Sequence, residues 1–360
     1  MRIGIMSMQR VRNYGSFLQA FGLKSLLEQQ GHEVSFVDIQ PAPPARPTGR
    51  LSRFTHRLGK VDKYLFKRIR FNKTRKENAR MFQEVQGTLL KLGPYATAEG
   101  CDAVVIGSDE IFTCDPKGPW QITAERFGDV PCSRVISYAA SCGYTGVEDI
   151  CPAHQPLIQQ GLARLSACSV RDENTAHFVE EIRGGEVLRH LDPVLIYGFE
   201  EELRRGEERG IPAEPYMVVY AYHGRIHHPA EIRAIRAYAK QHRLKTVAIG
   251  GLLPWCDTYV SLTPFEVLAY FRHAACVVTD TFHGTVLSAK YNKPVGVLVR
   301  PSNANKLEDL LRRLHIQDHA VRQPADLATV LDEVRDYTAF NQRVAEERER
   351  TLEYLQTALS

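Results

Sequence analysis

Short apolar stretches alternate with helical periodicity along most of the chain, and this alternation constrains the fold more than any other feature. Residues 1–6 predict a buried strand, residues 18–27 predict a helix that Gly31 ends, and residues 34–39 predict a second strand. Strand, helix and strand in this order form a βαβ unit, which builds a parallel, doubly wound sheet. The opening of the chain therefore predicts an α/β domain of the Rossmann type.

A second α/β pattern begins after residue 210. The predicted strands are 216–222, 246–250, 276–279 and 295–299, and the predicted helices are 231–242, 264–273 and 284–291. A chain of 360 residues exceeds the size at which one hydrophobic core usually stops growing. We therefore expect two Rossmann-like doubly wound domains facing a cleft, residues 1–198 and 211–330. We expect residues 331–360 to form a helical segment that packs back across the first domain.

Composition narrows the class of protein and its partners. The sequence has no apolar run long enough for a signal peptide or a membrane span, which predicts a cytoplasmic protein. The eight cysteines form no C-x-x-C pair, and His223, His227 and His228 lack a flanking carboxylate or cysteine pattern, so we expect no metal site. A net charge of +4 gives no ground for a nucleic-acid partner.

Most of the excess positive charge lies in residues 50–80, which follow a proline-rich stretch. Their apolar residues recur every three or four positions, as in an amphipathic helix, with arginines and lysines between them. One interpretation is a basic helical insertion that contacts a membrane surface or a lipid-linked acceptor. The alternative is a solvated helix face that packs on its own domain.

The most informative stretch is residues 276–285, where a hydrophobic strand ends in polar residues before a helix begins. His283 exchanges protons near neutral pH, and the helix N-terminus supplies backbone N–H groups for an anion. We expect Asp280 to orient His283. The alternative is structural, with Asp280 capping the helix and His283 filling a satisfied polar position.

Other predicted strands also end in polar groups, and open α/β sheets bind ligands at those ends. Arg171 follows one such strand and suits a carboxylate or phosphate, although an ion pair with Asp172 or Glu173 is the alternative. Asp109 and Ser141 follow two further strands. The loop 13–16 ends in a glycine and a serine before a helix, whereas the pair Gly250-Gly251 is a weak phosphate-loop signal that more often marks a turn.

Taken together, these segments resemble the polysaccharide pyruvyl transferase family, from residue 1 to about residue 318 and in the same order. The matching stretches are 13–20, 107–109, 140–143, 169–172, 192–193 and 280–284. The resemblance implies a GT-B-like fold and transfer of a pyruvyl group from phosphoenolpyruvate, without a cofactor or a metal, to two hydroxyls of a sugar or a lipid-linked glycan. Family members often carry a basic residue two positions before the histidine, where this chain has Thr281.

The resemblance also implies roles for individual residues. We expect His283 to be the general acid and base, Arg171 to clamp the donor, and Asp280 to orient the imidazole. The expected substrate-binding residues are Asn13, Gly15, Ser16, Asp109, Ser141, Thr281, Gly284, Arg300 and Lys306.

Two other functions fit the same architecture, because a fold does not determine a reaction. The first is a glycosyltransferase that uses a nucleotide sugar in the same cleft. The second is a non-catalytic member of the fold that binds a glycan, for which Thr281 is the sequence indication.

Overall fold

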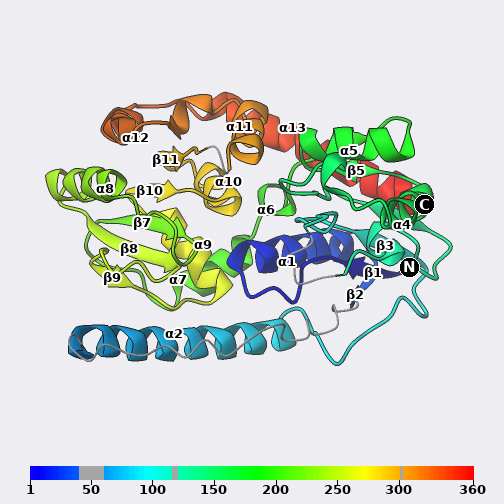
Figure 1. Ribbon diagram of the computed structural model, residues 1–360, viewed down its shortest axis with the longest axis horizontal. Coiled ribbons are helices and arrows are strands. Elements are labelled where there is room, and N and C mark those ends of the chain that lie inside the picture. The colour runs from blue at the N-terminus through cyan, green and yellow to red at the C-terminus, as the bar shows by residue number, and fades with distance from the viewer. Residues whose placement is uncertain (40–60, 116–120, 301–302) are drawn as a thin grey trace.

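The computed structural model describes residues 1–39, 61–115, 121–300 and 303–360, and it has two halves, each built around a parallel sheet (Figure 1). The first sheet has the order β2-β1-β3-β4, and the second has the order β12-β11-β10-β7-β8-β9. Every strand pair in both sheets is parallel, as the βαβ pattern predicts. The prediction of two doubly wound sheets is therefore confirmed.

The first half holds the amino-terminal elements. Its strands are β1 (Arg2–Met6), β2 (Glu33–Val37), β3 (Ala103–Ile106), β4 (Val135–Ser137), β5 (Ser169–Val170) and β6 (Leu188–Arg189). Its helices are α1 (Tyr14–Gln29), α2 (Val61–Thr88), α3 (Ala124–Phe127), α4 (Gln155–Ala163), α5 (Glu173–Arg183) and α6 (Pro193–Ile196). Isolated bridges from the β4 region to residues 167 and 170 extend the sheet towards the β5-β6 pair.

The second half holds the remaining elements. Its strands are β7 (Tyr216–Ala221), β8 (Lys245–Gly250), β9 (Thr258–Tyr259), β10 (Cys276–Thr279), β11 (Val295–Leu298) and β12 (Ala320–Val321). Its helices are α7 (Glu200–Glu207), α8 (Pro229–Gln241), α9 (Pro264–His273), α10 (Phe282–Lys290), α11 (Ala304–Arg313), α12 (Leu327–Asp332) and α13 (Thr338–Leu359). Short 3₁₀ turns lie at Val147–Asp149, Gln317–His319 and Pro324–Asp326.

Helix α1 lies at the centre of the molecule, between the two sheets (Figure 1). It is buried on nearly all sides because its apolar residues are not confined to one face. Phe17 packs against Phe265 of α9, and the hydroxyl of Tyr14 donates to the carbonyl of Leu262 at 2.8 Å. The first turn of α1 is therefore held by both halves of the protein.

Helix α2 runs along the lower edge of the molecule in Figure 1, below the second sheet and towards α1. Its Gln86 donates to the carbonyl of Gln9 in the first half, at 2.8 Å. Its Asn78 donates to the hydroxyl of Tyr259 in the second half, at 2.7 Å. Residues 61–80 of the predicted basic insertion are thus helical, whereas residues 50–60 lie outside the described residues.

Helix α13 returns from the second sheet to the first. Its Tyr354 hydroxyl donates to the carbonyl of Ser137 at 2.6 Å, and its ring packs on His190 in a tilted arrangement with centroids 4.7 Å apart. The carboxyl-terminal segment therefore packs across the first half. Among the helices of the described residues, none has the length and apolar character required to span a membrane.

Candidate active site

The carboxyl ends of strands in the first sheet meet the first turn of α10 from the second half. Asp109 follows β3, Arg171 follows β5, and Asp192 precedes α6, while His283 lies in the first turn of α10. Parallel strands place such residues at one edge of the sheet. The four side chains come together there, and each of the four residues is at most 8% exposed.

The guanidinium of Arg171 is enclosed by carboxylates and an aromatic ring. Its Nη1 donates to Asp192 Oδ2 at 3.0 Å and lies 3.7 Å from Asp109 Oδ1. The guanidinium carbon lies 4.0 Å from the centre of the Phe282 ring, a cation–π distance. Its Nε is buried and has no hydrogen-bond partner in the described part of the chain. The alternative for Arg171 was an ion pair with Asp172 or Glu173. The structure instead pairs Arg171 with Asp192 and Asp109.

The imidazole of His283 reaches the same carboxylate from the opposite half of the protein. Its Nε2 lies 3.5 Å from Asp192 Oδ2 and is buried without a hydrogen-bond partner among the described residues. The other edge of the ring packs on Gly15, where a Cβ atom would lie only 2.1 Å from Nδ1. Glycine at position 15 is therefore required for the imidazole to occupy this position.

Asp192 joins the two predicted catalytic residues; it lies in the matching stretch 192–193 but is not among the predicted site residues. Burial alone would raise its pKa, but His283, Arg171 and the Val194 N–H outweigh burial and lower the pKa to about 2. Its Oδ1 accepts from that N–H at 3.0 Å and caps α6. The Asp192-Pro193 dipeptide was a signal for this residue, since aspartate before proline is typical of a helix start.

The predicted role of Asp280 is not what the structure shows. Its Oδ2 accepts from Arg225 Nε at 2.8 Å and from Arg300 Nη1 at 2.6 Å, and its Oδ1 has no partner among the described residues. Asp280 therefore pairs with two arginines, and the carboxylate beside His283 belongs to Asp192. The physical reason is that Asp280 lies between strand and helix, whereas His283 lies inside α10, which begins after the extended N-cap residue Thr281.

The structural alternative, in which Asp280 caps the helix, is also wrong. The N-cap of α10 lies one residue later. Thr281 is the N-cap of α10, and its Oγ1 accepts from Gly284 N at 3.0 Å. The helix consequently starts at Phe282, two residues before the predicted start. Gly284 packs so closely against Thr279 that a Cβ atom would lie 2.1 Å from its Oγ1.

The other predicted binding residues divide into two groups. Ser16 donates to Asp109 Oδ2 at 2.6 Å, and Asn13 caps α1 by accepting from Gly15 N, so both border the buried cluster. Ser141 instead donates to Asp172 Oδ2 at 2.6 Å, and Lys306 pairs with Glu110 at 3.2 Å.

Arg300 lies on the far side of Asp280 from His283, where it also forms a bidentate pair with Glu231. The sequence predicts polar groups at strand ends, and the structure brings several of them together there. The sequence does not indicate which of the polar groups there face one another.

Backbone conformation at Asp109 is unusual for a residue with a side chain. Its φ of 73° lies in the left-handed region, which non-glycine residues adopt rarely and mainly at sites of function or tight turning. This conformation directs the Asp109 carboxylate to both Ser16 and Arg171.

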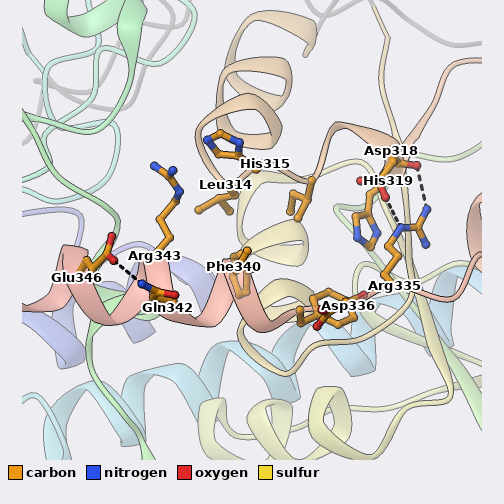
Figure 2. A pocket seen from close by; sticks show the side chains of 13 residues that line it. Leu314, His315, Asp318, His319, Arg335, Asp336, Phe340, Gln342, Arg343 and Glu346 are labelled. Atoms are coloured by element: carbon orange, nitrogen blue, oxygen red, sulfur yellow. Dashed lines mark hydrogen bonds and ion pairs between the residues drawn. The ribbon is translucent and has the colours of Figure 1, made fainter.

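Two cavities help to delimit the site. A cavity of about 770 Å³ borders Asn13 and Tyr222 between the two halves. Figure 2 shows another of about 310 Å³, in which Arg335 pairs with Asp318 beside the start of α13. Neither His283 nor Arg171 lines either cavity, so we assign the chemistry to the buried cluster itself.

A family model matches the stretch of sequence that carries this arginine, histidine and aspartate. The model for polysaccharide pyruvyl transferase matches residues 13–302, which include all four clustered residues. The chain belongs to this family. Family membership makes it an enzyme of the transferase class that acts on glycans, and it implies a glycan acceptor and a pyruvyl donor.

Solved structures support the fold assignment for this family member. UDP-GlcNAc 2-epimerase from Neisseria meningitidis superposes with a TM-score of 0.56 and 10% identity, covering 100% of this chain and 99% of that one. The epimerase from Methanocaldococcus jannaschii gives a TM-score of 0.53 and 11% identity, covering 98% and 100%. These similarities show the GT-B fold. A search of curated protein sequences finds no match to the chain.

Proposed function

We propose that the protein transfers a pyruvyl group from phosphoenolpyruvate to two hydroxyls of a glycan or glycolipid precursor, forming a cyclic ketal. The observation that carries the proposal is a buried pair of side chains, Arg171 and His283, that share Asp192: Arg171 Nε has no hydrogen-bond partner among the described residues, and His283 Nε2 has only the 3.5 Å contact with Asp192 Oδ2. Buried polar groups normally have partners, and those without one often mark a ligand position. The donor carries a carboxylate and a phosphate, which are the groups that a guanidinium binds best.

The proposed reaction starts with a proton transfer from His283 to the methylene carbon of phosphoenolpyruvate. The carbon that bears the phosphate becomes electrophilic, and the first sugar hydroxyl attacks it and returns its proton to His283. The carbon–oxygen bond to phosphate then breaks, and the second hydroxyl attacks the same carbon. The proton of the second hydroxyl leaves with inorganic phosphate, so the products are the ketal and phosphate.

Individual residues have distinct tasks in this scheme. Arg171 binds the donor anion, and Asp192 holds the guanidinium and the imidazole in fixed positions. An ionised Asp192 also attracts the imidazolium that forms when His283 takes up a proton. Asp280, with both arginines bound to one of its oxygens, is assigned no step in the reaction.

The access route to the site is part of the proposal. His283 is 4% exposed and Arg171 is 4% exposed, so the donor has to enter by a movement of the two halves. Closure around substrate is common in enzymes that must exclude water. The packing of Gly15 on His283 then forms or tightens as the halves close.

The test is a thermal-shift comparison of phosphoenolpyruvate and UDP-GlcNAc on the wild type, Arg171→Lys and His283→Gln. A ligand that binds only the folded state raises the melting temperature. We expect phosphoenolpyruvate to stabilise the wild type and His283→Gln, and to stabilise Arg171→Lys much less, because lysine lacks the planar fork. Phosphate release from phosphoenolpyruvate in the presence of acceptor should be lost in His283→Gln. Stabilisation by UDP-GlcNAc alone would instead favour the glycosyltransferase, and silence from both ligands would favour a glycan-binding protein without activity.

The predicted location and membrane contact also stay proposals. A cytoplasmic enzyme whose basic segment 50–80 touches anionic lipid would be positioned to act on a lipid-linked acceptor. Sedimentation with anionic vesicles, compared between the full chain and a variant with the lysines and arginines of residues 50–70 changed to glutamine, tests this contact. Equal sedimentation of the two proteins would contradict it.

A further inference from the structure

The cavity beside Asn13 borders the junction of the two halves. Its volume is about 770 Å³, and its walls come from the loop before α1, from α2, and from the ends of β7 and β8. Pockets for drug-sized ligands span about 300–1,000 Å³. The cavity therefore has room for a ligand considerably larger than a three-carbon donor.

Aromatic side chains dominate the walls of this cavity. They are Tyr14, Phe82, Tyr220, Tyr222 and Tyr259. Tyr222 is 42% exposed although its hydroxyl accepts a hydrogen bond from Asn13 Nδ2 at 2.9 Å. Tyr259 is fixed in a similar way by Asn78. The Tyr222 ring is thus held in place while part of its surface stays open to a ligand, whereas Tyr14, Phe82 and Tyr220 are at most 4% exposed.

Rings held in this way suit one face of a sugar. The faces of a pyranose carry C–H groups, which pack favourably on the electron-rich face of an aromatic ring. The edges of a pyranose carry hydroxyls, and amide and hydroxyl side chains such as Asn13 and Thr74 bind these. An aromatic wall with a few amide groups is a typical lining for a sugar.

The cavity borders the loop that packs on the proposed catalytic histidine, and His283 itself is not among its lining residues. Asn13 lines the cavity, and two residues along the chain Gly15 packs against the ring of His283. We propose that this cavity is the acceptor subsite, in which a sugar of a glycan stacks on Tyr222 and directs two hydroxyls past Asn13 towards His283. This inference rests on the proposed pyruvyl transfer, and it adds the class of acceptor and the residues that bind it.

The glycine pair at one wall, a weak phosphate-loop signal in the sequence, has a structural explanation. A Cβ atom at Gly251 would lie 2.6 Å from His223 N and 2.6 Å from Tyr222 C, and Gly250 has a φ of +88°. Both positions therefore require glycine for the turn and for close packing of two loops. The pair needs no phosphate to account for it.

The inference is tested by saturation-transfer difference NMR with a panel of methyl glycosides and disaccharides of the common hexoses and N-acetylhexosamines. The variants are Tyr222→Ala, which removes the stacking surface, and Thr74→Trp, which fills the cavity from α2. Tyr144→Ala is the matched control, because Tyr144 is 59% exposed and does not line the cavity. Melting curves check that each variant is folded, and phosphoenolpyruvate stabilisation is measured in parallel.

We expect at least one probe to bind the wild type and Tyr144→Ala, with at least tenfold weaker binding to Tyr222→Ala and none to Thr74→Trp. Equal binding of a probe by all four proteins would overturn the proposed subsite. A wild type that is stabilised by phosphoenolpyruvate but binds no probe would also overturn it. That second result would leave the proposed donor chemistry intact. Tyr222-dependent sugar binding without any effect of phosphoenolpyruvate would support the sugar site and refute the donor.

Discussion

Replacing Asp192 with asparagine removes the negative charge that holds Arg171 and His283 together, and the contacts set the size of the effect. Asparagine has nearly the same shape, and its oxygen can still accept the hydrogen bond from the Val194 N–H that caps α6. What the variant loses is the charge on a residue that is 1% exposed. Arg171 keeps only Asp109, whose Oδ1 is 3.7 Å away.

Two physical estimates bound the loss of stability. A pKa of about 2, against an ordinary value of 3.8, corresponds to about 2 kcal/mol of favourable interaction with the ionised form. Removing one partner of a buried ion pair costs about 3–5 kcal/mol, because the other charge is left without compensation. We therefore expect Asp192→Asn to lower the free energy of unfolding by about 2–5 kcal/mol.

The assay is urea unfolding of the two proteins, followed by tryptophan fluorescence and circular dichroism. The matched control is Asp102→Asn, because Asp102 also pairs with an arginine but is exposed, with its partner Arg2 61% exposed. Exposed pairs contribute little, so this control should unfold with the wild type. An Asp192→Asn protein with an unchanged urea midpoint and slope would refute the argument that its charge holds the site together.

Two further predictions follow from the contacts of α1 and α13. Gly15→Ala should displace the His283 ring and reduce phosphate release from phosphoenolpyruvate by a factor on the order of 10²–10⁴, the usual contribution of a general acid or base. Gly87→Ala, at a helical position with nothing within 4 Å, should keep full activity, and equal activity of both variants would contradict the proposed contact. Burial, with the positive charges of Arg350 and Arg313, lowers the pKa of His190 from 6.5 to about 4, so the unfolded chain takes up a proton at higher pH than the folded chain. The free energy of unfolding should therefore fall by about 3 kcal/mol between pH 6.5 and pH 4, and it should fall less in His190→Phe. An identical dependence on pH in both proteins would exclude His190 as its source.

The sequence predicts several elements closely where local signals agree with the apolar pattern. Helix α9 and strand β10 have the predicted bounds, 264–273 and 276–279. Pro264 is suited to a first helical position, and Thr263 with Glu266 forms a capping box. At α10 the competing caps Asp280 and Thr281 stand side by side, and local signals do not distinguish them.

The sequence predicts the candidate site only in part, because local signals do not show which side chains face one another. Arg171 and His283 were recognisable because each follows an apolar strand and carries a group suited to anions or protons. Asp280 was paired with His283 because the two are close in sequence, yet its side chain meets Arg225 and Arg300. Side-chain direction after a strand depends on the turn that follows, which sequence spacing does not give.

The sequence by itself determined the class of fold and the strand ends that could hold a site, because periodicity and turn residues act over a few positions. Only the tertiary structure decided that Asp192 binds both Arg171 and His283, and that Gly15 makes room for the imidazole. Those contacts join segments that are distant along the chain, and they depend on how α1 and α10 pack between two sheets. Packing of that kind is a property of the whole chain and leaves no local pattern in the residues it brings together.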